Sequence, residues 1–323
     1  MALQRACLYL YNMEKLDRSV FDWLLRDDVS LQFQTYRDLF GEFRPDLQKR
    51  IGQEGWGAGF LACRNADGSW GHGFYQPKWT SSHYTLLDLK TLNITASHPN
   101  IRASIEKILA RSKGPDGGIN PSQTILQSDV CINGMFLNYA CYFDIGEYPL
   151  RSVVDFVLEQ HMDDGGFNCR KNRSGANHSS LHSTISVLEG ISEYSRNGYG
   201  YRRGELDAAA AQAREFILMH HLFKSDHTGA IIHKDMLKLS FPPRWKYNIL
   251  RALDHFRASN TAWDERMRDA LDILLSKRRA DGRWPLQATH PGRVHFVMEK
   301  PRSPSRWNTL LALRVLKAYG PNL

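Results

Sequence analysis

Two kinds of helical segment alternate along the chain, and their apolar patterns differ. Segments of the first kind are amphipathic with one charged face, which is typical of helices on the outside of a helical array. Examples span 16–26, 150–160, 205–221 and 264–277. Segments of the second kind are apolar nearly all round, which predicts inner helices covered on both sides. They span 29–40, 82–93, 130–143, 181–194, 245–256 and 306–319.

A short turn recurs between these segments. It reads Asp-Gly-x-aromatic or Asp-Gly-x-Ile, and its copies occupy 67–70, 116–119, 164–167 and 281–284, with a degenerate copy at 226–231. The copies are roughly fifty residues apart, further where 197–204 is inserted. Glycine supplies the backbone freedom that ends a helix, and the apolar residue after it can pack against the neighbouring unit.

Six outer and inner helix pairs predict an all-α fold, a closed (α/α)6 toroid in which each pair buries its apolar face against its neighbours. We expect one domain over 1–323, with a first pair at about 16–40 and recognisable repeats over about 55–320. An open superhelix of the HEAT type is the alternative, although the Asp-Gly-aromatic turn is not typical of it.

These turns, over about 55–319, resemble the repeat of protein prenyltransferase β-subunits and triterpene cyclases, the prenyltransferase and squalene-cyclase superfamily. The resemblance implies an α/α toroid with a central cavity. It does not imply one reaction, because a single fold hosts several chemistries.

Composition is that of an ordinary globular protein, with 42% hydrophobic and 24% charged residues. No run of eighteen apolar residues is present and the first residues lack a secretory pattern, so we expect a cytoplasmic protein with no integral membrane segment. Five scattered cysteines fit a reducing compartment. The net charge of +8 favours an anionic partner. No basic run predicts nucleic-acid binding, and a protein partner remains an open possibility.

Each inner segment carries a Thr or Asn that opens its apolar run. Two positions before it stand Phe33, His83, Cys131, His182, Lys246 and Arg306. Together with Asp129, three of these offer carboxylate, thiol and imidazole groups, the ligands that zinc accepts. Protein prenyltransferases bind zinc through an Asp-x-Cys and a His on the next inner helix, and these map onto Asp129, Cys131 and His182.

His83 has no counterpart in that pattern and is added as a fourth candidate metal ligand, with Cys169 and His178 as further ones. The alternative is local and structural: Asp129 caps a helix, Cys131 packs as a small apolar residue, and His182 is hydrogen-bonded in the core.

Cationic and aromatic residues complete the expected mouth of the cavity. Arg244, Lys246, Arg302 and Arg306 lie beside proline-containing loops and suit a diphosphate or carboxylate, unless they pair with neighbouring acids. Trp79, Tyr84 and Trp307 are expected to contact substrate. Further aromatic candidates for the cavity wall are Tyr139, Tyr142, Trp245 and Tyr247.

These residues together predict a zinc-dependent enzyme of the prenyltransferase or terpene-cyclase type, acting on an isoprenoid or other anionic small molecule. Asp129, Cys131 and His182 would be catalytic through a bound Zn²⁺. The Asp-x-Asp-Asp acid of protonating cyclases is missing. The alternatives are a metal-independent cyclase-like protein and a non-catalytic lipid- or peptide-binding toroid. A polysaccharide lyase or glycosidase ranks lower because Asp129 is the only acid placed at the mouth.

Overall fold

The computed structural model describes residues 18–122 and 124–320. Within these ranges the chain is mostly helical, with two short strands, which agrees with the expected all-α class. Cys7, residues 1–12 and the first two residues of the outer segment expected at 16–26 lie outside the described residues. No helix that the structure describes is long and apolar enough to cross a bilayer.

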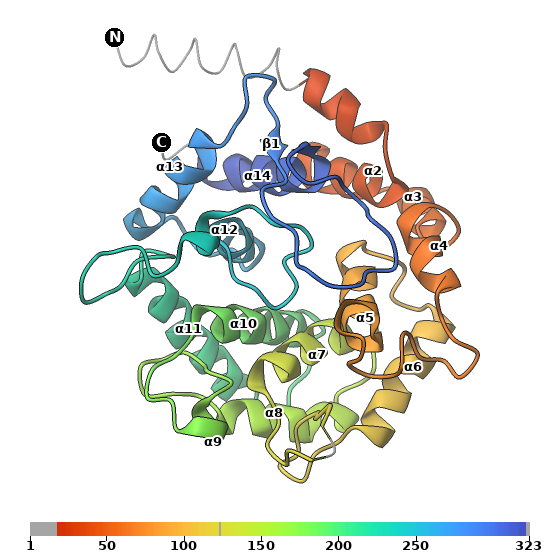
Figure 1. The fold of residues 1–323 in the computed structure, drawn as a ribbon, viewed down its shortest axis with the longest axis vertical. Helices are drawn as coiled ribbons and strands as arrows, with labels where there is room; N and C mark the ends of the chain where they lie inside the picture. Colours follow the sequence, from red (N-terminus) through yellow and green to blue (C-terminus); the bar gives the residue numbers. More distant parts are fainter. Residues whose placement is uncertain (1–17, 123, 321–323) are drawn as a thin grey trace.

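Six inner helices follow one another around a common centre (Figure 1). The first is α2, which a π-helical turn, η1, extends. In chain order they are α2 (Val29–Thr35) with η1 (Tyr36–Phe40), α5 (Ser82–Thr91), α7 (Val130–Tyr142), α10 (Leu181–Arg196), α12 (Ile249–Ala258) and α14 (Arg306–Tyr319).

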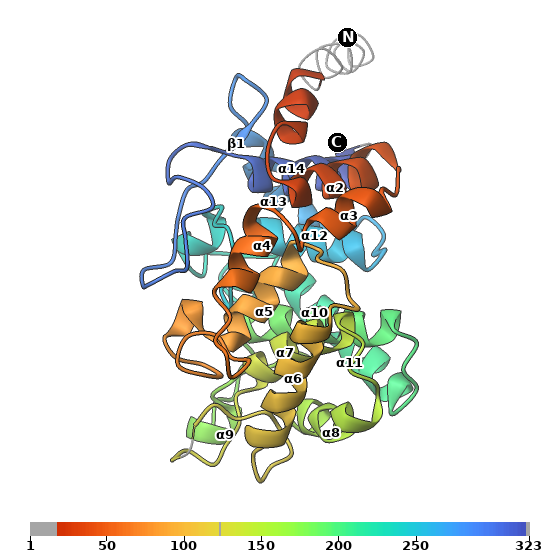
Figure 2. The ribbon, with the colours of Figure 1, turned by 90° about the vertical axis from the view of Figure 1, so that its right-hand side faces the viewer.

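A second set of helices covers this ring from outside, and Figure 2 shows α6 along the outer side. The set is a helix at 18–25 together with α3 (Pro45–Arg50), α4 (Gly55–Ala62), α6 (Pro99–Arg111), α8 (Arg151–Glu159), α11 (Arg203–Met219) and α13 (Arg268–Ser276). Shorter elements fill the connections: η2 (Lys78–Thr80), η3 (Tyr148–Leu150), α9 (Lys171–Ser174), η4 (Lys234–Leu237), η5 (Glu265–Met267), and the antiparallel strands β1 (Trp284–Pro285) and β2 (Pro304–Ser305).

The repeated turns form as predicted. Their glycines, Gly68, Gly117, Gly165 and Gly282, all have φ between 78° and 88°, a conformation that glycine adopts without steric cost. In two copies a tryptophan closes the preceding outer helix, because Trp70 Nε1 donates to Phe60 O and Trp284 Nε1 donates to Leu274 O, both at 2.7 Å. The degenerate copy forms an isolated antiparallel β-bridge between Lys224 and Ile231, as the second copy does between Lys113 and Ile119.

A polar side chain at the start of an inner helix ties each turn to that helix. The backbone N–H of the turn's apolar residue donates to it, and the pairs are Trp70 to Ser82 Oγ (2.9 Å), Ile119 to Asn133 Oδ1 (2.6 Å), Phe167 to Thr184 Oγ1 (3.0 Å) and Trp284 to Thr309 Oγ1 (3.0 Å). These bonds define which inner-helix positions are equivalent. Ser82 and Thr309 take the places that the sequence pattern gave to Thr85 and Asn308.

This register corrects the expected ring of residues at the mouth. His83 follows its tying residue, whereas Cys131 and His182 each precede theirs by two positions. The inner helix expected at 245–256 begins at Ile249, where Asn248 caps it by accepting from Arg251 N–H. Lys246 therefore lies in the preceding loop rather than on the helix.

Helices α7 and α10 approach most closely of all the inner helices, through two glycines. A β-carbon on Gly134 would lie 2.6 Å from Ser186 O and from Val187 Cα, and one on Gly190 would lie 2.3 Å from Gly134 O. The atoms it would meet are backbone atoms, which cannot move without displacing the helix. This contact sets the separation of the two helices that carry Cys131 and His182.

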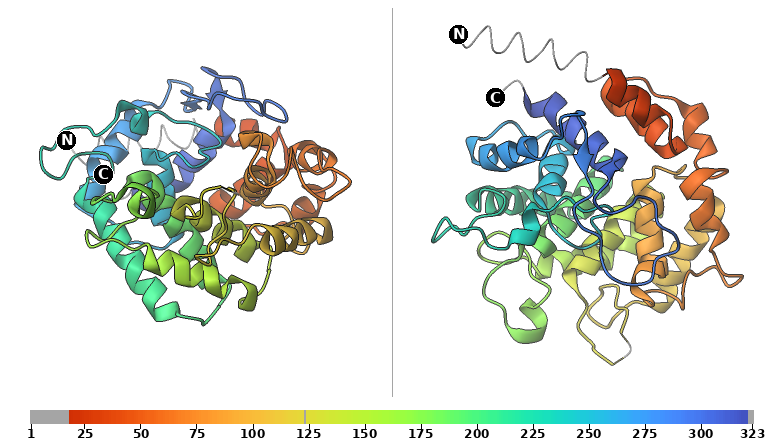
Figure 3. Two further views of the ribbon diagram at one scale, coloured as in Figure 1. Left: turned by 60° about the horizontal axis from the view of Figure 1, so that its bottom comes forward. Right: turned by 45° about the horizontal axis from the view of Figure 1, so that its top comes forward.

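The last helix closes the ring by packing beside the first. Arg314 of α14 bonds to Asp38 at the end of η1, at 2.9 Å, and Lys317 Nζ donates to the carbonyl of Leu39 at 2.9 Å. The loop between β1 and β2 crosses in front of the ring in Figure 1, and Figure 3 shows the same loop from two further directions.

Candidate functional site

The residues expected to hold zinc do not converge. Asp129 Oδ2 lies 3.2 Å from Arg173 Nη2, and His182 Nδ1 accepts the backbone N–H of Tyr247 at 2.8 Å. His83 is fully buried and meets Tyr139 Oη at 3.3 Å. Within 18–122 and 124–320, no three His, Cys, Asp or Glu side chains are grouped to hold a metal ion. The described residues therefore give no support for a zinc centre, and the zinc site stays a prediction.

Cys131 meets Cys169, which the sequence reading named only as a further candidate. Cys169 Sγ accepts hydrogen bonds from the backbone N–H of Cys131 and from Ser183 Oγ–H, both at 3.3 Å. The hydrogen bond with Cys131, outweighing burial, lowers the pKa of the Cys169 thiol, whereas the same contact and burial raise the pKa of Cys131.

Two of the four cations expected at the mouth, Arg244 and Arg306, pair with acids of the protein. Arg244 Nη1 lies 2.6 Å from Asp88 Oδ2, with both side chains almost fully buried. Complete burial raises the pKa of Asp88 to about 6 in spite of this arginine. Arg306 pairs with Asp27 at 2.7 Å, and Arg302 is exposed on the loop before β2. Arg244 and Arg306 therefore follow the alternative given above, in which the arginines pair with neighbouring acids.

The aromatic candidates lie in different places, some at a cavity and some in the core. Trp307 stacks on Phe241 with ring centroids 4.6 Å apart and lines the central cavity, as does Tyr142. Trp79 donates from Nε1 to Pro291 O at 2.7 Å and lines a second cavity of about 340 Å³ beneath the loop between β1 and β2. Tyr84 is fully buried against Trp79.

A cavity of about 490 Å³ lies inside the ring. Its walls come mainly from the C-terminal halves of α5, α7 and α10, from α12 and α14, and from η1. The segment from Ser240 to Arg244 closes it on the side of the expected mouth. The inner helices thus line the cavity mainly near their C-terminal ends, whereas the predicted site residues lie near the N-terminal ends.

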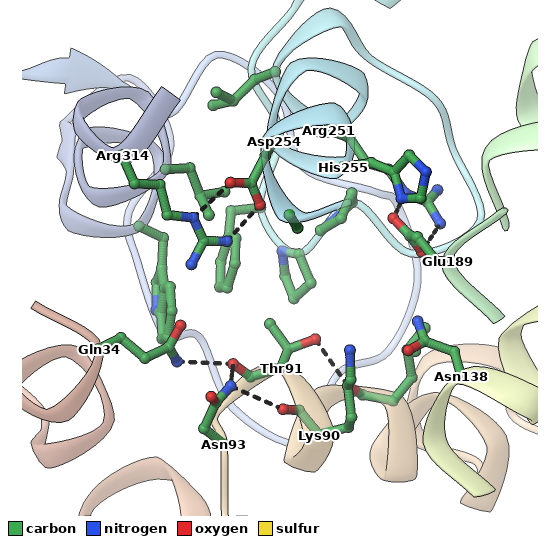
Figure 4. A pocket seen from close by; sticks show the side chains of 18 of the residues that line it. Gln34, Lys90, Thr91, Asn93, Asn138, Glu189, Arg251, Asp254, His255 and Arg314 are labelled. Carbon is green, nitrogen blue, oxygen red and sulfur yellow. Dashed lines mark hydrogen bonds and ion pairs between the residues drawn. The ribbon is translucent and has the colours of Figure 1, made fainter. Parts of the chain in front are cut away.

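Many of the side chains in this wall are charged (Figure 4). Seven cations and five acids line it: Arg37, Lys90, Arg196, Arg244, Arg251, Arg257 and Arg314, with Asp38, Asp88, Glu189, Glu193 and Asp254. From the sequence, a polysaccharide lyase or glycosidase ranks lower because Asp129 is the only acid expected at the mouth. This cavity contains five acids, so that argument does not apply to it.

The charges form separate networks. In the first, Arg314 lies between two carboxylates, with Nε 2.6 Å from Asp254 and Nη1 2.9 Å from Asp38. Arg37 adds a contact to Asp38 at 2.6 Å, and Arg257 adds one to Asp254 at 2.9 Å. This chain thus joins three guanidinium groups with two carboxylates. Burial raises the pKa values of Asp38 and Asp254, but their arginines outweigh it and both are lowered.

A second network joins Glu193 to Lys90 at 3.2 Å and to Arg196 at 3.0 Å. Glu189 pairs with Arg251 through two hydrogen bonds: Arg251 Nη2 donates to Oε2 at 2.7 Å and Nε donates to Oε1 at 2.8 Å. Among the described lining residues, the first two networks therefore each contain one more cation than acid, whereas the Arg251 and Arg244 pairs are balanced.

Three buried polar atoms of the lining have no hydrogen-bond partner among the described residues: Asn138 Oδ1, His255 Nε2 and Trp307 Nε1. Asn138 and Arg314 share a repeat position with Glu189, five residues after the tying residues Asn133, Thr309 and Thr184. That shared position was a signal in the sequence, because three polar residues interrupt otherwise apolar helices at the same place.

Burial makes His255 a source of acid sensitivity. It lowers the pKa of this side chain from 6.5 to about 4, so the folded protein keeps it neutral while the unfolded chain is protonated below pH 6.5. Its contribution to stability is complete above pH 6.5 and is lost as the pH falls toward 4. At pH 5 we expect it to cost about 2 kcal/mol.

Urea unfolding at pH 7 and pH 5 measures this contribution. The difference in unfolding free energy between the two pH values should shrink by about 2 kcal/mol in His255→Gln. It should not change in His227→Gln, whose side chain is 81% exposed. An unchanged difference in His255→Gln would show that this histidine is protonated in the folded protein.

Comparisons with known proteins concern the fold. No protein family model matches the chain, and no curated protein matches it in sequence. Among solved structures, a polysaccharide lyase, BACCELL_00875, is similar with a TM-score of 0.52 and 11% identity over 92% of this chain and 91% of that one. The type II terpene cyclase MstE from Scytonema gives a TM-score of 0.34 and 12% identity over 86% and 98%. At 11% identity the lyase is evidence for shared architecture alone, and the cyclase is too distant to support an argument.

Proposed function

We propose that the chain is an (α/α)6 toroid whose central cavity binds a small hydroxylated acid, such as a sugar acid or a short oligosaccharide containing one. The carrying observation is that two ion-pair networks facing this cavity each contain one surplus cation. A ligand with carboxylate groups would balance these charges, and guanidinium groups bind carboxylates with good geometry.

The remaining lining agrees with this class of ligand. Polar side chains between the charged ones, among them Asn138 and Ser192, are suited to hydrogen bonds with hydroxyl groups. A wall of ion pairs is a poor match for an isoprenoid chain, because hydrocarbon gains little from burial beside charges that would lose their water. The chemistry of the cavity thus favours a polar ligand over the isoprenoid expected from the sequence.

Isothermal titration calorimetry of the whole chain with digalacturonate tests the proposal, with the neutral disaccharide lactose and with geranylgeranyl diphosphate as comparisons. We expect digalacturonate to bind and lactose to bind much more weakly. Binding of geranylgeranyl diphosphate but not of digalacturonate would refute the proposal in favour of an isoprenoid cavity, and binding of none of the three would refute it as well.

Two substitutions locate the binding without leaving a buried acid unpaired. Arg196→Gln removes one surplus cation while Lys90 still pairs with Glu193, and Arg257→Gln removes the other while Arg314 still pairs with Asp254. Each should weaken digalacturonate binding on the order of tenfold, since each loses one charge-assisted hydrogen bond. Arg102→Gln, on outer helix α6, is the matched control and should leave the affinity unchanged.

A further inference from the structure

The two thiols at the start of α7 lie outside the lining of the central cavity, and the proposed function does not use them. Cys131 is in the first turn of α7, and Cys169 is in the loop that follows the third repeated turn. Their contact is direct, because Cys169 Sγ lies 3.3 Å from the backbone nitrogen of Cys131. Both side chains are partly exposed, whereas Cys141 is buried and Cys63 is exposed.

Hydrogen bonds hold the Cys169 thiol and the loop that follows it. Cys169 N–H donates to Ser183 Oγ at 3.2 Å, and the same hydroxyl donates back to Cys169 Sγ at 3.3 Å. The loop after Cys169 is fastened to the segment before Cys131, since Asn172 Nδ2 donates to Ser128 O at 2.9 Å. These contacts keep Cys169 Sγ next to the first turn of α7, which carries Cys131.

We propose that Cys131 and Cys169 form a reversible disulfide when the protein meets a low-molecular-weight disulfide such as oxidised glutathione, with Cys169 as the attacking thiol. The two N–H and O–H groups directed at Cys169 Sγ stabilise negative charge there, and an attacking sulfur must carry that charge. Cys131 Sγ then resolves the intermediate.

The exchange balances in two steps. The Cys169 thiol loses its proton and its sulfur attacks one sulfur of oxidised glutathione, so that a mixed disulfide forms, the glutathione S–S bond breaks, and one glutathione leaves as thiolate and takes up a proton. The Cys131 thiol then loses its proton and its sulfur attacks Cys169 Sγ, which releases the second glutathione. Two cysteine thiols are oxidised, and one glutathione disulfide is reduced to two thiols.

The experiment uses the whole chain incubated with oxidised glutathione, blocked with N-ethylmaleimide and mapped by mass spectrometry without reduction. Trypsin places Cys131 and Cys141 on one peptide and Cys169 on another, and cleavage at Met135 separates the first two. We expect a crosslinked species that joins the Cys131 and Cys169 fragments, a glutathione adduct on Cys63, and no glutathione on Cys141. Dithiothreitol should restore both thiols.

Substitutions identify the roles of the two thiols. In Cys131→Ser we expect Cys169 to stop at the glutathione adduct, because no resolving thiol remains. Ser183→Ala should slow the crosslink on the order of threefold, because one donor to the attacking sulfur is lost. Ser195→Ala is the control, since Ser195 lies on the same helix and bonds to Asp207 instead.

Two results would overturn the proposal. One is modification of Cys63 while Cys131 and Cys169 both remain available to maleimide. The other is a glutathione adduct on Cys169 that persists in the unaltered chain without crosslinking. Neither result depends on what the central cavity binds, so this test and the test of the proposed function fail separately.

Discussion

Gly134→Ala is expected to lower the free energy of unfolding by about 3 kcal/mol or more. The new methyl group would lie 2.6 Å from Ser186 O and Val187 Cα, and these backbone atoms belong to the neighbouring helix α10. Helices α7 and α10 would have to separate, which would disturb their packing over several turns. Urea or thermal unfolding followed by circular dichroism measures the loss.

Gly204→Ala is the matched control for this change. Gly204 also lies in a helix, α11, and a β-carbon there would meet nothing within 4 Å. Alanine is the better helix former, so this variant should be as stable as the unaltered chain or more stable by about 0.5–1 kcal/mol. Equal stability of Gly134→Ala and Gly204→Ala would contradict the close contact between α7 and α10.

Arg314→Met is expected to destabilise the fold by about 3–5 kcal/mol, because it takes the shared partner from two largely buried carboxylates. Asp38 and Asp254 would keep only Arg37 and Arg257, which are more exposed than Arg314. The substitution also removes the ion pair between Arg314 of α14 and Asp38 of η1, which connects the last inner helix to the first. Denaturant unfolding at pH 7 gives the magnitude.

The pH dependence separates this electrostatic cause from lost packing. Without Arg314 the pKa values of Asp38 and Asp254 should rise in the folded state, so protonation near pH 4.5 should recover part of the lost stability relative to the unaltered chain. Arg44→Met, which breaks an exposed pair with Asp46, should change little at either pH. A loss of the same size at both pH values would assign the effect to packing alone.

Local signals in the sequence predicted the helices well. The glycine of each repeated turn ends an outer helix, and the buried residue after it begins the approach to an inner one, so 82–93, 130–143 and 306–319 were placed to within two residues of α5, α7 and α14. The helix at 245–256 was started four residues early. Trp245 and Tyr247 continue the apolar pattern there, while Asn248 caps the helix at Ile249.

The register of the ring was harder to predict. Thr85 was chosen as the opening residue because it begins an apolar run, but the bond to the turn is made by Ser82, one helical turn earlier. That error placed His83 level with Cys131, whereas the structure places it against Tyr139. A single hydrogen bond across the repeat decides this, and hydrophobic periodicity does not contain it.

The charged cavity could not be assembled from spacing at all. Arg314 and Asp38 are 276 positions apart, and Arg244 and Asp88 are 156 apart. Each pair forms only because the ring brings distant helices together. From the sequence, the basic residues are therefore expected to be free to bind an external anion, whereas in the structure several of them form ion pairs with acids of the protein.

The segment from Ser240 to Arg244 has a consequence for the shape of both cavities. Phe241, Pro242 and Arg244 line both the central cavity and the one beneath the loop between β1 and β2, so they form a thin wall between two chambers. Because the two cavities share these residues, a substitution at Phe241 or Arg244 should alter the shape of both chambers at once.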